Sequence, residues 1–174
     1  MVTASAAGKA ILFGEHAVVY GQPALAIAID ARVSVSLEPC QGDWKIDGYP
    51  LDSSRHPHID YLRNAILGDD SQPYSIQINS ELFPAAGLGS SAALSSACSA
   101  AMLSTIGQPL DSEKISAHSH LAEAAAQSGR ASPTDTSTAT LGGCVFVSDK
   151  KEQSSEWRYT RSLETPEGER NWEV

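Results

Sequence analysis

The stretch PAAGLGSSAA, residues 84–93, joins a glycine- and serine-rich loop to an apolar segment of small residues that continues to Met102. A helix that begins after such a loop has backbone N–H groups without intrahelical partners, and its dipole adds partial positive charge at that end. The junction therefore favours an anion, and phosphate above all. Gly87 and Gly89 let the backbone approach that anion closely, while the hydroxyls of Ser90 and Ser91 can cap the helix or bind a metal ion held by phosphates.

A second interpretation of the same loop is an ordinary turn followed by a helix N-cap. The loop alone does not decide between the two, because isolated glycine-rich motifs are weak signals. It is not a Walker A loop, since no Gly-Lys-Ser or Gly-Lys-Thr closes it. The decision depends on other segments of the chain.

The composition is that of an acidic globular protein. A length of 174 residues suits one domain, residues 1–174, and 41% hydrophobic with 19% charged residues is an ordinary balance. The formal net charge of −9 argues against a nucleic-acid partner, so an anionic ligand such as ATP needs a local positive site. Three cysteines without Cys-x-x-Cys spacing favour a reducing, cytoplasmic setting. No apolar run approaches the ~20 residues of a membrane span, and no signal-peptide pattern is present, so no membrane partner is expected.

The order of the expected elements predicts a mixed α+β fold, with strands first and a strand–loop–helix–helix–strand unit after them. Alternation of valines and Leu37 with Arg32 and serines over residues 32–37 is typical of a half-buried strand. Asp111 is expected to cap the second long helix. Strands are expected within 2–39, 43–46, 74–82, 138–147 and 157–163, helices from about Pro57 to 67, over 90–105 and over 111–127, and a loop over 128–133.

Two further segments resemble motifs of a known family. Residues 5–21, SAAGKAILFGEHAVVYG, resemble the N-terminal motif of mevalonate kinases. Residues 132–138, SPTDTST, ahead of Gly142-Gly143, are similar to the segment that carries the catalytic aspartate in archaeal-type members. With the loop at 84–93, their order and spacing over roughly residues 2–148 resemble the GHMP kinases, which include galactokinases and the homoserine, mevalonate and phosphomevalonate kinases. The Gly-Glu-His motif and the residues after it resemble mevalonate kinases more than galactokinases.

This resemblance implies an N-terminal GHMP-kinase domain with a mixed or antiparallel sheet and helices packed on one side. It implies transfer of a phosphoryl group from ATP to the primary hydroxyl of mevalonate, with Mg²⁺ as cofactor and ATP and mevalonate as partners. Such a transfer depends mainly on positioning and charge neutralisation, with one carboxylate near the attacking hydroxyl. The ATP phosphates are expected to bind Gly87, Leu88, Gly89, Ser90 and Ser91.

The resemblance also assigns the remaining roles. Asp135 is the carboxylate beside the hydroxyl, as general base or as the group that orients it, and Lys9 stabilises the developing alkoxide and keeps Asp135 ionised. Mg²⁺ is expected to bind Ser91 and Glu123, because this ion takes only one or two oxygen ligands from protein when phosphates and waters supply the rest. The substrate is expected to contact Glu15, His16 and Thr136.

Structural interpretations of these residues remain open at this point. Asp135 could be a turn residue after Pro133, and Lys9 could be a solvated loop lysine. Glu123 could be an exposed helix glutamate. Glu15 could cap a turn, and His16 could be a structural histidine. The pairs His56–His58 and His118–His120 also suggest a metal site. Residues i and i+2 of a helix do not share a face, so no metal site is expected there. Cys98 and Cys144 are expected to be small buried apolar residues.

The sequence departs from the family pattern in three places. Ala7 stands where members usually have proline, and Ser128 resembles an insertion between Glu123 and Asp135. The C-terminal half of the family fold, with its third glycine-rich motif, is expected to be absent, so the chain resembles an N-terminal half whose activity depends on the rest. A homo-oligomer or a partner chain could then cover apolar surface. The alternative functions are a catalytically silent nucleotide-binding or interaction module and another GHMP small-molecule kinase.

Overall fold

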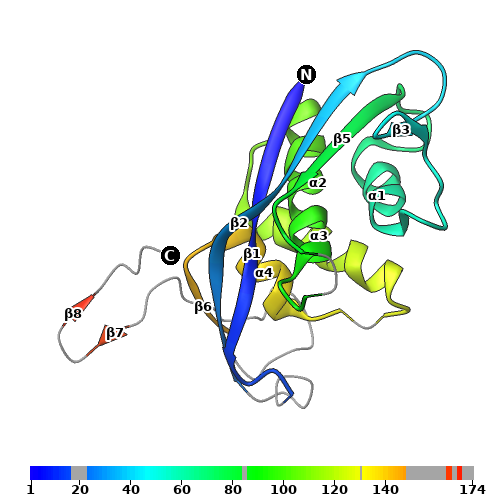
Figure 1. Ribbon diagram of the computed structural model, residues 1–174. Coiled ribbons are helices and arrows are strands. Elements are labelled where there is room, and N and C mark those ends of the chain that lie inside the picture. The colour runs from blue at the N-terminus through cyan, green and yellow to red at the C-terminus, as the bar shows by residue number, and fades with distance from the viewer. Residues whose placement is uncertain (17–22, 84–85, 130, 148–163, 166–167, 170–174) are drawn as a thin grey trace.

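The protein has a six-stranded sheet with helices packed on one face (Figure 1). The predicted site residues lie on the first strand, on the helices and on the loops next to them. The computed structural model describes residues 1–16, 23–83, 86–129, 131–147, 164–165 and 168–169. Strands β1 (Val2–Phe13) and β2 (Ala24–Pro39) form a long antiparallel pair. On its other edge, β2 pairs with β5 (Tyr74–Ser80) through its second half and with β6 (Cys144–Val147) through its first half.

The sheet is mixed, as predicted, although most of its pairs are antiparallel. Strand β3 (Lys45–Ile46) runs parallel to β5 and forms a hairpin with β4 (Tyr49–Pro50). A separate antiparallel pair joins β7 (Glu164–Thr165) to β8 (Gly168–Glu169). The strand predicted over 157–163 lies outside the described residues.

The predicted helices are confirmed within a few residues at each end. They are α1 (Pro57–Leu62), which continues into a π-helical turn η2 (Arg63–Leu67), α2 (Ser90–Thr105) and α3 (Ser112–Ala126). Asp111 caps α3 as predicted, because its side chain accepts a 2.8 Å hydrogen bond from the backbone N–H of Glu113. No helix in the described ranges is long and apolar enough to cross a membrane.

The strand predicted over 138–147 is wrong in its first half. Residues Pro133–Leu141 form a helix, α4, and only Cys144–Val147 are a strand. The run of threonines suggested a strand because β-branched residues favour extended backbone. Within the protein, however, Thr138 donates a hydrogen bond from its hydroxyl to the carbonyl of Thr134 one turn earlier, so a buried threonine is satisfied inside the helix. Pro133 suits the first turn, and Gly142 ends the helix with φ +70°.

The inner face of β1 and β2 changes phase near Lys9. Ala6 belongs to the hydrophobic cluster under the helices, and Lys9, three residues later, reaches Gly89 and Asp135 on the helix side, whereas strict alternation would place the two residues on opposite faces. Val33 and Ala28 show the same change on β2, where the register between the strands shifts. This irregularity turns the Lys9 side chain toward the helices.

Helix α2 lies across β1 and β2 and also packs against α3 and α4, which explains its small side chains. Its second half meets an apolar core with side chains that are at most 2% exposed. We use the name apolar core for Val33, Val35, Leu37, Ile59, Leu62, Ile76 and Met102. Cys98 and Cys144 are free and buried, as predicted.

Candidate active site

Three segments that are far apart in the sequence meet at Lys9. Its backbone N–H donates a 2.9 Å hydrogen bond to the carbonyl of Leu88 in the glycine-rich loop. Its Nζ lies 3.1 Å from Oδ1 of Asp135 in the first turn of α4. Lys9 is only 6% exposed, so the interpretation of it as a solvated loop lysine is wrong. Strand β1, the loop before α2 and the start of α4 therefore form one site.

The loop needs glycine at position 89 because of Lys9. Gly89 has φ +71°, and a Cβ atom there would lie 2.7 Å from Cγ of Lys9. Gly87 has a similar φ of +73°, but a Cβ atom there would have no neighbour within 4 Å. The two glycines thus share a backbone conformation, while only Gly89 also leaves space for the lysine stem.

The N-terminus of α2 has Gly89 as its N-cap, and no side chain among the described residues caps it. Of the two roles predicted for the serine hydroxyls, capping is therefore not observed; Ser91 instead donates a 2.8 Å hydrogen bond to Oε2 of Glu123, the other residue predicted to bind Mg²⁺. Ser90 lies in the first turn and is partly buried. The first N–H groups of α2 consequently remain available to an anion near the loop.

Asp135 is a helix residue rather than part of an isolated turn. Burial raises the pKa of its carboxyl group above the usual value, Lys9 lowers that pKa, and Glu123 and Glu15 raise it. Lys9 thus favours the ionised form of Asp135, whereas burial, the larger effect, favours the neutral form. That Lys9 keeps Asp135 ionised stays a prediction. Although Lys9 is within ion-pair distance, the buried Oδ1 atom has no aligned hydrogen-bond donor among the described residues. This oxygen can accept a hydrogen bond from a bound ligand.

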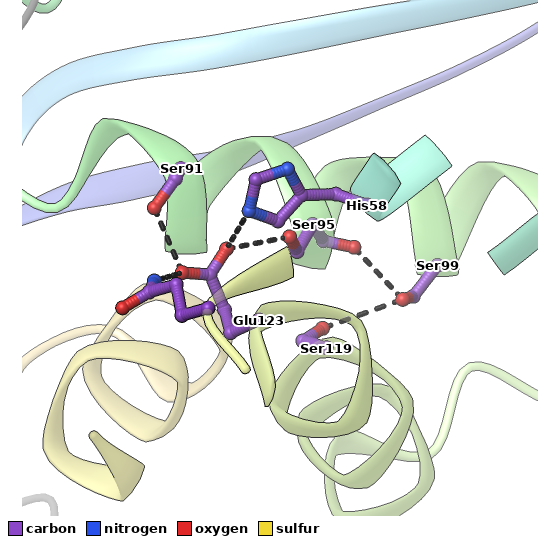
Figure 2. Close-up of polar contacts among 7 residues, drawn as sticks. His58, Ser91, Ser95, Ser99, Ser119 and Glu123 are labelled. Atoms are coloured by element: carbon purple, nitrogen blue, oxygen red, sulfur yellow. Dashed lines mark hydrogen bonds and ion pairs between the residues drawn. The ribbon is translucent and has the colours of Figure 1, made fainter. Parts of the chain in front are cut away.

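Glu123 is 4% exposed, so its interpretation as an exposed helix glutamate is wrong. Its Oε2 accepts hydrogen bonds of 2.8 Å from the Ser91 hydroxyl and 2.8 Å from the Gln127 amide. Its Oε1 accepts a 2.9 Å hydrogen bond from Ser95 and lies 3.2 Å from Nε2 of His58 (Figure 2). A buried carboxylate needs such partners because it has lost its hydration.

The pair Ser91–Glu123 fits Mg²⁺ in chemistry and placement. Both contribute hard oxygen atoms, which this ion prefers, and those atoms lie 2.8 Å apart at the start of α2. Within the described residues, no group of three or more His, Cys, Asp or Glu could hold a metal ion. A site with two protein ligands therefore depends on phosphate oxygens and water for the rest of the coordination sphere, which is the usual pattern for Mg²⁺.

The other predicted substrate residues differ in their placement. Glu15 and His16 follow β1 and are exposed, and Glu15 is close enough to affect the pKa of Asp135. Thr136 is fully buried, and its hydroxyl donates to the carbonyl of Pro133 at 3.4 Å. Its role in substrate binding remains a prediction, as do the roles of Glu15 and His16.

His58 is the residue that sequence reasoning missed. It lies on α1 and meets Glu123 on α3 because these two helices pack against each other. Burial lowers the pKa of His58, Glu123 raises it and His56 lowers it. The local spacing His56-x-His58 pointed only to a metal site, and no local signal pairs a histidine with a carboxylate on a distant helix.

Comparison with known proteins agrees with this geometry. Residues 58–143 match the GHMP kinases N terminal domain. This segment, which runs from α1 through α4, is therefore similar to the N-terminal domain of the GHMP kinases. Curated relatives are mevalonate kinases: the enzyme of Methanothermobacter thermautotrophicus is 39% identical over 86% of this chain and 51% of its own length. The enzyme of Pyrococcus furiosus is 33% identical over 86% of this chain and 52% of its own length.

Solved structures show the same relationship. The Methanococcus jannaschii mevalonate kinase has a TM-score of 0.72 and 27% identity, over 86% of this chain and 54% of that one. The Lactococcus lactis galactokinase has a TM-score of 0.74 at 12% identity, over 94% of this chain and 48% of that one, which shows a shared fold alone. The chain spans about half the length of the curated relatives it matches.

Proposed function

We propose that this chain provides the phosphate loop and the catalytic pair of a mevalonate kinase. The observation that carries the proposal is the convergence of Lys9, Asp135 and the Gly89 loop, with Lys9 Nζ 3.1 Å from Asp135 Oδ1 and Lys9 N 2.9 Å from Leu88 O. The names of the relatives supply the substrate, and the uncapped start of α2 is suited to the phosphates of ATP.

In the proposed reaction, the primary hydroxyl of mevalonate attacks the γ-phosphorus of ATP. A bond forms between the hydroxyl oxygen and phosphorus, the bond from phosphorus to the bridging oxygen breaks, and ADP leaves with that electron pair. Oδ1 of Asp135 accepts a hydrogen bond from the hydroxyl group of mevalonate. Asp135 then takes the hydroxyl proton as a general base, or it only orients the hydroxyl group and the proton leaves after the new bond has formed. Lys9 stabilises negative charge on the attacking oxygen.

Ser91 and Glu123 are the residues that would hold Mg²⁺. When bound there, the ion neutralises charge on the phosphates and fixes their orientation. The N–H groups after Gly89, in the same first turn of α2 as Ser91, would orient the same phosphates. We also propose a cytoplasmic setting, which the free cysteines Cys40, Cys98 and Cys144 support.

A panel of substrates tests this function. ATP-dependent phosphorylation is measured with mevalonate, phosphomevalonate, homoserine and galactose, and turnover of mevalonate is expected to exceed the others. ATP-dependent thermal stabilisation is measured in parallel, because it detects nucleotide binding without turnover. Turnover of another of these compounds in preference to mevalonate would overturn the assignment of mevalonate as the substrate. Stabilisation by ATP with no turnover of any of them would indicate a silent nucleotide-binding module, and light scattering would then show whether the chain self-associates.

A further inference from the structure

The carboxylate of Glu123 is held from two sides, and the two oxygens have different surroundings (Figure 2). Oε2 accepts from Ser91 at the start of α2, which is the side of the glycine-rich loop. Oε1 accepts from Ser95, one turn further along α2, and lies 3.2 Å from Nε2 of His58 on α1. One oxygen therefore faces the site, while the other is held by groups behind it.

We propose that His58 is a positioning residue that keeps Oε2 of Glu123 directed at the cation beside Ser91. The inference rests on the proposed function, since it assumes that Ser91 and Glu123 hold a divalent cation with ATP. It concerns the chain's own residues and adds a third helix, α1, to the two that supply the ligands.

The geometry supports a positioning role rather than a ligand role for His58. The ring lies behind the carboxylate, next to the oxygen that faces away from Ser91, and its side chain is only 19% exposed. An ionised carboxylate can only accept, so a favourable contact requires the proton on Nε2. The two atoms lie 3.2 Å apart without being aligned as a hydrogen bond, so their contact is a short-range electrostatic attraction rather than a hydrogen bond.

The remaining support of Oε1 comes from a connected set of hydroxyls. Ser95 donates to Oε1 at 2.9 Å, and its own carbonyl accepts a 2.8 Å hydrogen bond from Ser99. Ser99 in turn contacts the Ser119 hydroxyl at 3.3 Å on the same helix as Glu123. Because these groups fix α2 against α3, removal of His58 leaves Oε1 with one donor, Ser95, while the Gln127 amide still donates to Oε2 at 2.8 Å. Rotation about the terminal torsion of Glu123 then becomes easier.

A purely structural role predicts something different. If His58 only compensated the burial of a carboxylate, its loss would lower the stability of the whole protein and weaken nucleotide and cation binding together. A positioning role predicts selective loss of cation affinity, since partners behind a metal ligand orient it. Loss of such a partner weakens metal binding by about 10- to 100-fold.

The test uses Mn²⁺ as the probe on the full chain. Free Mn²⁺ is measured by electron paramagnetic resonance in the presence of ATP, and ATP binding is measured separately with EDTA. His58→Phe is expected to weaken Mn²⁺ binding by about 10-fold and to leave ATP binding in EDTA unchanged. His58→Gln, whose amide can also donate to a carboxylate, is expected to restore most of the affinity. His56→Gln, two residues away at the N-cap of the same helix, is the matched control and is expected to match the wild type.

Ser95→Ala gives a second approach if His58→Phe fails to fold, because it removes the other donor to Oε1 from a different helix. It is expected to weaken Mn²⁺ binding in the same direction. Wild-type Mn²⁺ affinity in both His58→Phe and Ser95→Ala, together with its loss in Glu123→Gln, would overturn the positioning role and leave the proposed function intact. Equal loss of Mn²⁺ and ATP binding would overturn it in favour of the structural role. Wild-type protein that binds no ATP, with or without Mn²⁺, would overturn the proposed function and this inference together.

Discussion

Two regions of this protein are equally buried but chemically opposite. The apolar core is made of hydrocarbon side chains between the sheet and the helices. The second region lies between α2, α3 and α4, and we name it the polar layer: Ser95, Ser99, Ser119, Glu123, Thr134, Thr136 and Thr138. Its residues are at most 4% exposed, yet nearly all of them carry hydroxyls.

The difference shows that burial has two separate uses in this fold. In the apolar core, removal of surface from water stabilises the folded state. In the polar layer, burial is unfavourable for a polar group without a partner, and hydrogen bonds within this layer or to nearby carbonyls hold its side chains, except that of Thr134, whose Oγ1 has no partner among the described residues. The polar layer adjoins Ser91 and Asp135, so it supports the site, whereas the apolar core supports the fold. The predictions below test this division.

The largest expected effect is on catalysis. Asp135→Asn keeps the shape of the side chain but removes its ability to accept a proton. Turnover is expected to fall by about 10²–10⁴-fold, while ATP-dependent thermal stabilisation is retained. Steady-state kinetics and thermal unfolding measure the two effects separately. Unchanged turnover would remove Asp135 from the catalytic role.

The apolar core is expected to respond in stability alone. Ile76→Ala removes a side chain that is 0% exposed and is expected to lower the free energy of unfolding by about 2–5 kcal/mol. Ile106→Ala is the matched control, because the same side chain there is 47% exposed and its loss is expected to change stability by about 0.5 kcal/mol or less. Chemical denaturation gives both values. A large fall in kcat per folded Ile76→Ala molecule would contradict the separation of the two regions.

A substitution at the boundary is expected to affect both properties. Alanine at Gly89 or Gly87 is strained by about 1–2 kcal/mol, since both positions have positive φ. Only Gly89→Ala also pushes against Lys9, whose Cγ would lie 2.7 Å from the new Cβ. Both variants are therefore expected to lose similar stability in denaturation, with a much larger fall in kcat for Gly89→Ala. Equal kcat values for the two variants would show that the contact with Lys9 is unimportant for turnover.

The smallest expected effect is a change in titration. Because Lys9 lowers the pKa of Asp135, Lys9→Met is expected to raise that pKa further above its usual value. A carboxyl whose pKa is higher folded than unfolded contributes stability below its unfolded pKa, and this is lost as the pH rises through the folded pKa. Lys9→Met is thus expected to lose more stability at neutral than at acid pH.

Carbon-13 NMR of the aspartate carboxyl group measures this titration, and denaturation at both pH values measures stability. Lys114→Met, at an exposed position on α3, is the control and is expected to leave Asp135 unchanged. An unshifted carboxyl titration in Lys9→Met would show that the two charges do not interact.

The sequence was informative where the physical cause is local. Alternation over residues 32–37 predicted which side chains of β2 are buried, and the glycine-rich loop before an apolar segment predicted where α2 begins. Lys9 and Asp135 were identified through motif resemblance, and the structure places them 3.1 Å apart. Each of these predictions needed only a few neighbouring residues or a recognisable motif.

Predictions failed where packing over long distances decides the outcome. The threonines of α4 have strand propensity, but Thr138 satisfies its hydroxyl inside the buried helix, which propensity cannot reveal. For Ser91, residue type alone left capping of α2 open beside metal binding, and only the packing of α2 against α3 shows that its hydroxyl donates to Glu123. The contact of His58 with Glu123 depends on the packing of α1 against α3, and neither residue carries a local sign of it.

The interrupted alternation of side chains in β1 has a consequence for the design of a similar site on another protein. In a strand with uninterrupted alternation, Lys9 would be on the opposite side of the sheet from Ala6, and the ammonium group would be directed away from Asp135. Grafting the lysine, the aspartate and the glycine-rich loop onto a regular designed sheet would therefore give an inert surface. The irregular pairing of β1 with β2 has to be copied as a component in its own right.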